Sequence, residues 1–171
     1  MAKVKIIVEG TTDKALVNNI LQNEGKKEKI DYEFLGLKGL DSVLKTLKSL
    51  TPKDMQDNIY FAIVDADKSF SKRNTQMQEL TKKQIDYFIF PNNQDNGNLE
   101  TLLLDQIEDK VIDCFEEYEN CIDKELDKKA KLYAYTTVKL NKRPEDYILN
   151  LELNDNFNEL KEKLINLFKE E

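Results

Sequence analysis

The sequence predicts an α/β protein with an open sheet of about four parallel strands, helices on both faces and a C-terminal helical extension. Short apolar segments typical of buried strands alternate with segments of helical periodicity over about the first 90 residues. Such an alternation predicts a parallel sheet covered by helices. The 171 residues fit a single domain, with an α/β core over residues 1–105 and a mainly helical extension over residues 106–171.

The first two predicted strands are each followed by a helix. An apolar strand over residues 4–8 precedes a helix that ends at Gly25, a residue type that commonly ends helices. A second strand over residues 32–35 precedes a helix that starts after Gly39 and stops before Pro52.

The third and fourth strands complete the predicted sheet. Residues 61–64 are apolar without a break, which indicates a strand buried on both faces. Residues 72–84 predict a helix, and residues 87–90 predict a fourth strand that is closed by Pro91.

The extension is predicted to begin with a long helix near Leu99. The apolar stripe of this helix consists of Leu103, Ile107, Val111, Cys114, Phe115, Tyr118 and Ile122. The two cysteines, Cys114 and Cys121, lack the spacing of metal ligands, so we expect core residues in a reducing cytosol. A last amphipathic helix carries Phe157, Leu160, Leu164, Leu167 and Phe168 on its apolar face.

Composition narrows the chemistry. The chain contains no histidine, which excludes Ser-His and Cys-His nucleophile pairs and removes the usual neutral-pH base. Catalysis would have to use carboxylates, lysines, hydroxyls or a bound metal. No apolar run approaches the ~20 residues that cross a bilayer, and the N-terminus lacks a signal peptide. We therefore expect a cytoplasmic protein without a membrane partner.

Charge is unevenly distributed along the chain. The net charge of −7 argues against broad, non-specific nucleic-acid binding. Residues 105–123 are strongly acidic, whereas residues 124–143 are basic and include Tyr133 and Tyr135. The basic segment could carry a single nucleic-acid strand, but pairing with the acidic helix before it is the simpler interpretation.

Carboxylates follow three of the predicted strands. Glu9 ends the first strand, Asp65 and Asp67 end the third, and Glu100 follows the fourth. The carboxyl ends of parallel strands meet at one edge of a sheet, where ligands bind in α/β proteins. Four carboxylates without histidine or cysteine predict an oxygen-ligand site for Mg²⁺ or Mn²⁺.

A metal ion would also offset a repulsion between the two aspartates. If the chain stays extended, Asp65 and Asp67 share a face about 6–7 Å apart. Two charges at that separation repel by about 2–3 kcal/mol at an effective dielectric constant near 20.

Two other phosphate-site patterns fit poorly. The segment VEGTTDK lacks the GxxxxGK[ST] spacing of a P-loop. The segment IVDADKS resembles the nucleophilic DxD strand of haloacid-dehalogenase-type phosphatases. In that family the motif ends the first strand of the core, whereas here it ends the third.

A strand ending in Glu9-Gly10, followed by a strand ending in Asp65-Ala66-Asp67, resembles a Toprim domain. This catalytic domain is shared by type IA and II topoisomerases, bacterial primases and overcoming-lysogenization-defect nucleases. The segments VEGTTDK and GNLETLL most resemble the last group and a small stand-alone Toprim-related family. The resemblance covers residues 3–105 and implies a Toprim-like, Rossmann-like fold.

The resemblance implies roles for individual residues. Glu9 would act as general acid/base or metal ligand, and Asp65 and Asp67 would bind Mg²⁺. Glu100 matches an acidic residue that helps to hold a second metal in the nuclease branch, and Asp13 matches a position that is often acidic there. Both residues could instead simply favour the N-terminal ends of their helices.

The chain departs from Toprim enzymes in two ways. Lys68 and Ser69 follow the DxD motif where topoisomerases have a third aspartate, so a two-carboxylate, nuclease-type arrangement fits better. The 171 residues also contain no ATPase domain, and activity could depend on a separately encoded ATPase partner. A homo-oligomer is a further open alternative.

Basic residues after the DxD motif suggest contact with substrate. Lys68, Lys72 and Arg73 could hold a substrate phosphate or the leaving oxygen, although charge runs are usually solvated helix faces. The sequence thus supports two hypotheses: a Mg²⁺-dependent nuclease acting on DNA or RNA, or a non-catalytic Toprim module that binds a partner protein or nucleic acid.

Overall fold

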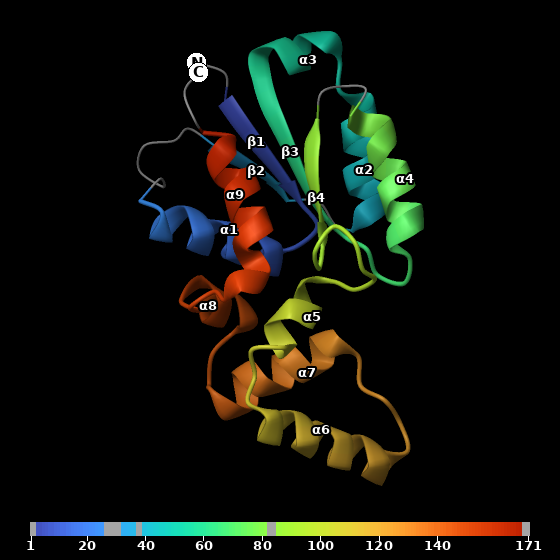
Figure 1. The fold of residues 1–171 in the computed structure, drawn as a ribbon, viewed down its shortest axis with the longest axis vertical. Helices are drawn as coiled ribbons and strands as arrows, with labels where there is room; N and C mark the ends of the chain where they lie inside the picture. Colours follow the sequence, from blue (N-terminus) through green and yellow to red (C-terminus); the bar gives the residue numbers. More distant parts are fainter. Residues whose placement is uncertain (1–2, 26–31, 37–38, 82–84, 169–171) are drawn as a thin grey trace.

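The computed structural model describes residues 3–25, 32–36, 39–81 and 85–168. They form a four-stranded, fully parallel sheet in the order β2-β1-β3-β4, with helices on both faces (Figure 1). The strands are β1 (Lys3–Val8), β2 (Tyr32–Gly36), β3 (Asn58–Asp65) and β4 (Asp86–Phe90). The predicted fold class is therefore confirmed.

Side chains of the central strands alternate between two cores, as the pleat of a strand requires. In β3, Phe61 and Ile63 enter one core, whereas Ala62 and Val64 enter the other. All four are buried, which explains why this strand is an unbroken apolar run.

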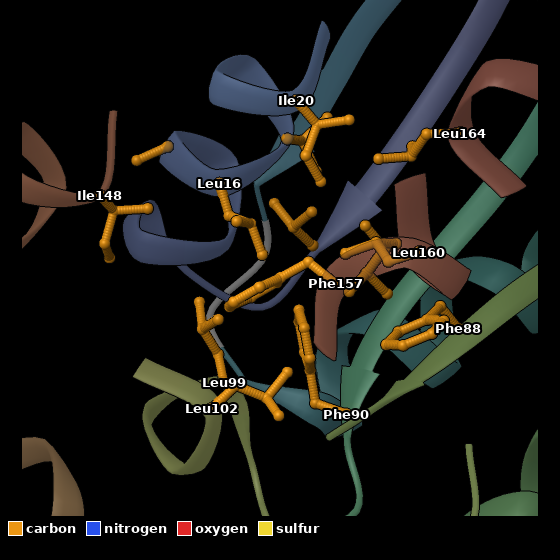
Figure 2. Close-up of a cluster of buried hydrophobic side chains, with 14 of the residues drawn as sticks. Leu16, Ile20, Phe88, Phe90, Leu99, Leu102, Ile148, Phe157, Leu160 and Leu164 are labelled. Carbon is orange, nitrogen blue, oxygen red and sulfur yellow. The ribbon is translucent and has the colours of Figure 1, made fainter. Parts of the chain in front are cut away.

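Helices from three separate parts of the chain cover one face of the sheet. They are α1 (Thr11–Asn23), α5 (Leu99–Leu104) and α9 (Asn158–Asn166). Phe157, Leu160 and Leu164 pack in one cluster with side chains of α1 and β4, so the end of the extension belongs to the main core (Figure 2). The apolar face predicted for the last helix is confirmed for these three residues.

Two helices cover the opposite face, α2 (Leu40–Ser49) and α4 (Phe70–Thr81) (Figure 1). Helix α2 stops before Pro52, as predicted, and a short helix that was not predicted, α3 (Pro52–Asp57), begins at that proline. Its N-cap, Thr51, accepts a hydrogen bond from the Asp54 N–H. The last residues of the helix predicted over 72–84 lie outside the described residues.

The long helix predicted from Leu99 is wrong, because the chain turns after α5. A second helix, α6 (Asp109–Ile122), starts only after Glu108, whose ψ of 132° is not helical. The turn places Ile107 in the main core, 5% exposed. Burial of this side chain against the sheet is incompatible with a straight continuation of α5.

The stripe predicted to be buried on α6 is largely exposed, because no residue of this helix is buried. Tyr118 is 54% and Ile122 40% exposed. Cys114 and Cys121 are free and exposed, so their assignment to the core is also wrong. Helix α6 lies away from the sheet and below α5 in Figure 1, and it contacts the main core through the partly buried Val111 and Ile112.

The rest of the extension returns the chain to the sheet. It comprises α7 (Lys128–Ala134), a π-helical turn (Tyr135–Lys139), α8 (Pro144–Leu149) and a 3₁₀ turn (Asp155–Phe157). Helix α8 packs against α1, where the buried Asn19 side-chain amide donates hydrogen bonds to the carbonyl oxygens of Ile148 and Leu151 at 2.7 and 2.8 Å.

The basic segment after α6 pairs with the acidic helix, which was the simpler interpretation. Lys131 Nζ lies 2.9 Å from Glu119 Oε1, and both side chains are largely buried. Lys139 also pairs with Glu108, at 3.3 Å. In the part of the chain that the structure describes, no helix is long and apolar enough to span a bilayer.

Candidate metal centre

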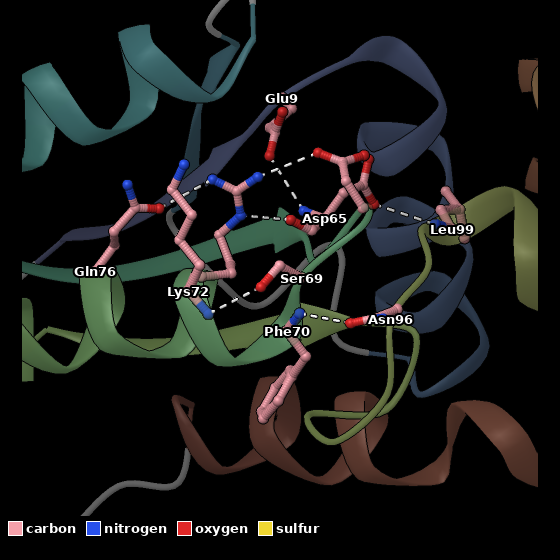
Figure 3. Close-up of polar contacts among 10 residues, drawn as sticks. Glu9, Asp65, Ser69, Phe70, Lys72, Gln76, Asn96 and Leu99 are labelled. Carbon is pink, nitrogen blue, oxygen red and sulfur yellow. Dashed lines mark hydrogen bonds and ion pairs between the residues drawn. The ribbon is translucent and has the colours of Figure 1, made fainter.

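Glu9 and Asp65 meet at the carboxyl edge of the sheet because β1 and β3 are parallel neighbours. Glu9 Oε1 accepts a hydrogen bond from the Asp65 backbone N–H at 3.1 Å (Figure 3). One oxygen of the glutamate is thereby held against the end of β3. The predicted convergence of these two strand ends is present.

The Asp65 side chain points toward α5. Its Oδ1 accepts a hydrogen bond from the Leu99 backbone N–H at 3.1 Å (Figure 3). An N–H of the first helical turn lacks a partner within the helix, and a carboxylate is well suited to accept its hydrogen bond. This bond places Glu100, the next residue, beside the same edge, where it is only 5% exposed.

Helix α1 contributes Asp13, which is 7% exposed. Its Oδ2 accepts a hydrogen bond from the Gly10 N–H at 2.8 Å, and Gly10 is the N-cap of the helix. Asp13 therefore stabilises the N-terminal end of α1, as the sequence suggested. Its carboxyl group also lies near those of Glu9 and Glu100.

Electrostatic repulsion links these carboxyl groups. Burial raises the pKa of Asp65 to about 9, and the charges of Asp13, Glu9 and Glu100 add to the increase. Burial likewise raises the pKa of Asp13 to about 7, helped by Glu100 and Glu9. The pKa of Glu9 is raised mainly by burial, against the hydrogen bond from Asp65 and the charge of Arg73. Four carboxyl groups thus interact, and their full ionisation is unfavourable without added positive charge.

Asp67 departs from the arrangement expected for an extended chain. Its backbone is left-handed, with φ of 53°, and its N–H donates to the Gly97 carbonyl oxygen at 2.7 Å. Its exposed side chain forms an ion pair with Arg73, at 3.1 Å between Oδ2 and Nη2. The repulsion expected between Asp65 and Asp67 is thus replaced by an attraction between Asp67 and a cation.

Arg73 has a positioning role that the sequence did not reveal. Its buried guanidinium donates from Nε to the Asp65 carbonyl oxygen at 2.6 Å and from Nη1 to Gln76 Oε1 at 3.2 Å. With the Asp67 contact, three different acceptors surround it. The sequence indicated only that a cation follows the DxD motif, and did not indicate this internal use.

Gly97 is a second position that the sequence did not reveal. Its φ of 142° is unfavourable for other residues, and an added Cβ would lie 2.8 Å from Thr101 Oγ1. The Gly97 carbonyl accepts the Asp67 N–H, so this glycine helps to fix the direction of the DxD loop. A glycine in a turn-rich segment is the only sequence signal of this role.

The residues fit a hard divalent ion by their chemistry, since the donors are carboxylate oxygens. As positioned, no three histidine, cysteine, aspartate or glutamate residues of the described ranges are arranged to hold a metal ion. The structure brings Glu9, Asp13, Asp65 and Glu100 into electrostatic contact. Metal binding would require these side chains to move closer to one another. Asp67 would also have to give up its ion pair with Arg73 to bind the metal.

The fold and its acidic edge define a class of protein, those with a Toprim-like fold. The chain is similar to the C-terminal region of the Burkholderia pseudomallei OLD protein, with a TM-score of 0.60, 12% identity and 98% coverage of both chains. The same region of the Xanthomonas campestris pv. campestris OLD protein gives a TM-score of 0.56 and 11% identity, covering 97% of this chain and 93% of that one. At these identities the likeness shows the fold alone.

The chain belongs to the family described as "Protein of unknown function (DUF3226)", whose model matches residues 3–170. A hypothetical protein from Pyrococcus horikoshii OT3 has a similar structure, with a TM-score of 0.61 and 15% identity over 98% of this chain and 94% of that one. No curated protein matches the sequence. The family match fits the small stand-alone Toprim-related group that the motifs resemble.

Proposed function

We propose that this protein is a Toprim-type, Mg²⁺-dependent phosphotransferase, and specifically a nuclease that hydrolyses nucleic-acid phosphodiesters. One observation carries the proposal: Glu9 at the end of β1, Asp13 in α1, Asp65 in β3 and Glu100 in α5 meet at one edge of the sheet. Burial and the neighbouring carboxylates raise the pKa values of Glu9, Asp13 and Asp65. Groups whose protonation is perturbed in this way gather at functional sites.

The residues that would hold Mg²⁺ or Mn²⁺ are Glu9, Asp65, Asp67 and Glu100. The ion would supply Lewis-acid polarisation of a phosphoryl oxygen and would lower the pKa of a bound water. The positive charge would also favour ionisation of Asp65, whose pKa of about 9 opposes it.

Glu9 is the group best placed to move a proton. The Asp65 N–H holds Oε1, which orients the carboxyl group and leaves Oε2 as the proton acceptor. Because the pKa of Glu9 is raised, the carboxylate is a stronger base than an exposed glutamate. It can take a proton from the attacking water and return it to the leaving oxygen.

The test replaces Asp65 with asparagine and measures cleavage of labelled single- and double-stranded DNA and RNA. Purified protein is incubated with Mg²⁺, with Mn²⁺ or with EDTA. We expect metal-dependent cleavage by the wild type and its loss in Asp65→Asn. Asp113→Asn, at an exposed position of α6, is the matched control and should cleave normally. Equal activity of wild type and Asp65→Asn would refute the catalytic proposal.

A specific observation favours a second candidate, a non-catalytic Toprim module that acts with a partner protein. Asp67 is already neutralised by Arg73, so the site in this state does not present both DxD carboxylates together. Titration of Mn²⁺ while the melting temperature is followed separates the candidates. A ligand that binds only the folded state raises the melting temperature by mass action. A flat response would favour the non-catalytic module.

A further inference from the structure

A small hollow lies beside the candidate metal centre, between the end of β3 and the first turn of α4. It has a volume of about 190 Å³ and is lined by Ala66, Lys68, Ser69, Lys72 and Arg73. This volume is below the ~300 Å³ at which pockets for drug-sized ligands begin, so the hollow suits a small group rather than a whole nucleoside.

Three of the five residues that line the hollow are cationic, although the accessible surface of the lining is mainly apolar. Arg73 is paired with Asp67, but Lys68 and Lys72 are exposed and have no acidic partner among the described residues. No acidic side chain lines the hollow. Two unneutralised ammonium groups beside a guanidinium favour an anion with several oxygen atoms, such as a phosphate group.

Ser69 adds a neutral donor to this lining. Its Oγ accepts the Lys72 backbone N–H at 3.3 Å, which leaves its own hydroxyl proton available to a ligand. A phosphate oxygen is an acceptor, whereas a cation or an amide N–H would leave this proton without a partner.

The hollow is separate from the carboxylate cluster. In Figure 3, Lys72 and Leu99 lie on opposite sides of Asp65, and Glu100 follows Leu99 in α5. A phosphate group in the hollow would therefore lie beside the acidic edge and not within it. It would be a neighbour of the phosphate that reacts.

We propose that the hollow binds a non-reacting phosphate group of a nucleic-acid strand, so that the substrate is an oligonucleotide and not a mononucleotide. This inference rests on the proposed function and specifies its substrate. If one phosphate of a nucleic-acid strand lies at the carboxylates, the next phosphates of that strand lie along the edge of the sheet, near Lys68 and Lys72.

The test measures binding in EDTA, without metal and without cleavage. Fluorescence anisotropy with a labelled single-stranded oligonucleotide compares wild type with the double variant Lys68→Gln/Lys72→Gln. We expect about a tenfold loss of affinity, the size of one charge-assisted hydrogen bond. The dependence of log affinity on log salt should also become shallower by about 0.7 for each phosphate contact removed.

Lys53→Gln is the matched control. Lys53 is an exposed lysine of α3, a helix that precedes the first residue of β3 and so lies at the opposite edge of the sheet. The variant removes one positive charge at a distance from the hollow, against two in the double variant, and should bind the oligonucleotide like the wild type. Melting temperatures establish that all variants fold. Normal binding by the double variant, an equal loss in Lys53→Gln, or no binding by wild type would each overturn the inference.

Competition experiments identify the source of the phosphate. Inorganic phosphate, a mononucleotide and an unlabelled oligonucleotide are titrated against the labelled strand. Competition by the oligonucleotide at far lower concentration supports a strand-binding site, whereas equal competition by inorganic phosphate overturns it. The proposed function is tested separately: its failure appears as absent metal-dependent cleavage, even where binding depends on Lys68 and Lys72.

Discussion

Glu9 and Asp65, 56 positions apart in the sequence, are joined by a 3.1 Å hydrogen bond from the Asp65 backbone to the Glu9 carboxylate. The bond shows that the acidic ends of β1 and β3 are built as one unit. It uses a backbone donor, so that a substitution of the Asp65 side chain leaves it intact. The electrostatics of this edge can therefore be changed without removing the contact that shapes it.

We expect the thermal stability of the metal-free protein to fall as pH rises from 5 to 9. The pKa values of Asp13 and Asp65 are about 7 and 9 in the folded state, against 3.8 for an unperturbed aspartate. A folded state with the higher pKa binds the proton more tightly, so the stability that these two groups contribute is fully present below pH 3.8 and is lost as pH rises to the folded pKa. Melting curves in EDTA across this range test the expectation. A rise in melting temperature would contradict it.

Asp65→Asn should be at least as stable as the wild type at pH 8. The difference in the free energy of unfolding between the two proteins should be smaller at pH 5. An asparagine side-chain oxygen can still accept the Leu99 N–H. At pH 8 the native aspartate, with a folded pKa of about 9, must take up a proton on folding, whereas asparagine needs none. At pH 5, which is closer to the unfolded pKa of 3.8, this cost is smaller. Urea unfolding at both pH values gives the difference, and Asp113→Asn supplies the baseline. A loss of stability at pH 8 would contradict the raised pKa of Asp65.

Arg73→Ala should lower the free energy of unfolding by about 2–3 kcal/mol, the cost of unpairing buried hydrogen-bonded groups. The substitution leaves the Asp65 carbonyl and Asp67 without their donor. Arg143 is the control, because its side chain is 83% exposed and its ion pair with Asp146 spans 3.7 Å. Arg143→Ala should cost less than about 0.5 kcal/mol. Similar losses in the two variants would refute the positioning role of Arg73.

Gly97→Ala should cost more than Gly25→Ala. Both glycines have positive φ, and alanine in the left-handed region costs about 1–2 kcal/mol. A Cβ at Gly97 would also come within 2.8 Å of Thr101 Oγ1, whereas a Cβ at Gly25 would meet nothing within 4 Å. Chemical denaturation of both variants measures the difference. Equal costs would mean that the contact with Thr101 relaxes freely.

The sheet and the meeting of Glu9 with Asp65 could be predicted because they follow from local patterns and a general rule. Continuous apolar runs mark strands covered on both faces, and parallel strands bring their carboxyl ends to one edge. These inferences need no knowledge of contacts between residues that are distant in the sequence. The direction of the Asp67 side chain could not be predicted in this way, because it depends on a hydrogen bond to the carbonyl oxygen of Gly97, 30 positions later.

The errors in the extension have the same origin. The helical period of the sequence continues through Ile107. In the structure, however, α5 ends at Leu104, and the Ile107 side chain is buried in the core beside the sheet. An amphipathic pattern also does not say whether another element packs on its apolar face. On α6 none of the described residues is buried, so the pattern that predicted Cys114 and Tyr118 inside was misleading.

The position of α9 on the sheet has a consequence for how this protein is made. Phe157 and Leu160 cover Phe88 and Phe90, although they leave the ribosome about seventy residues later. Until then part of one apolar face of the newly synthesised sheet is exposed to solvent, and native packing cannot be completed during most of translation. A chain interrupted before Phe157 should therefore aggregate rather than persist as a smaller folded unit.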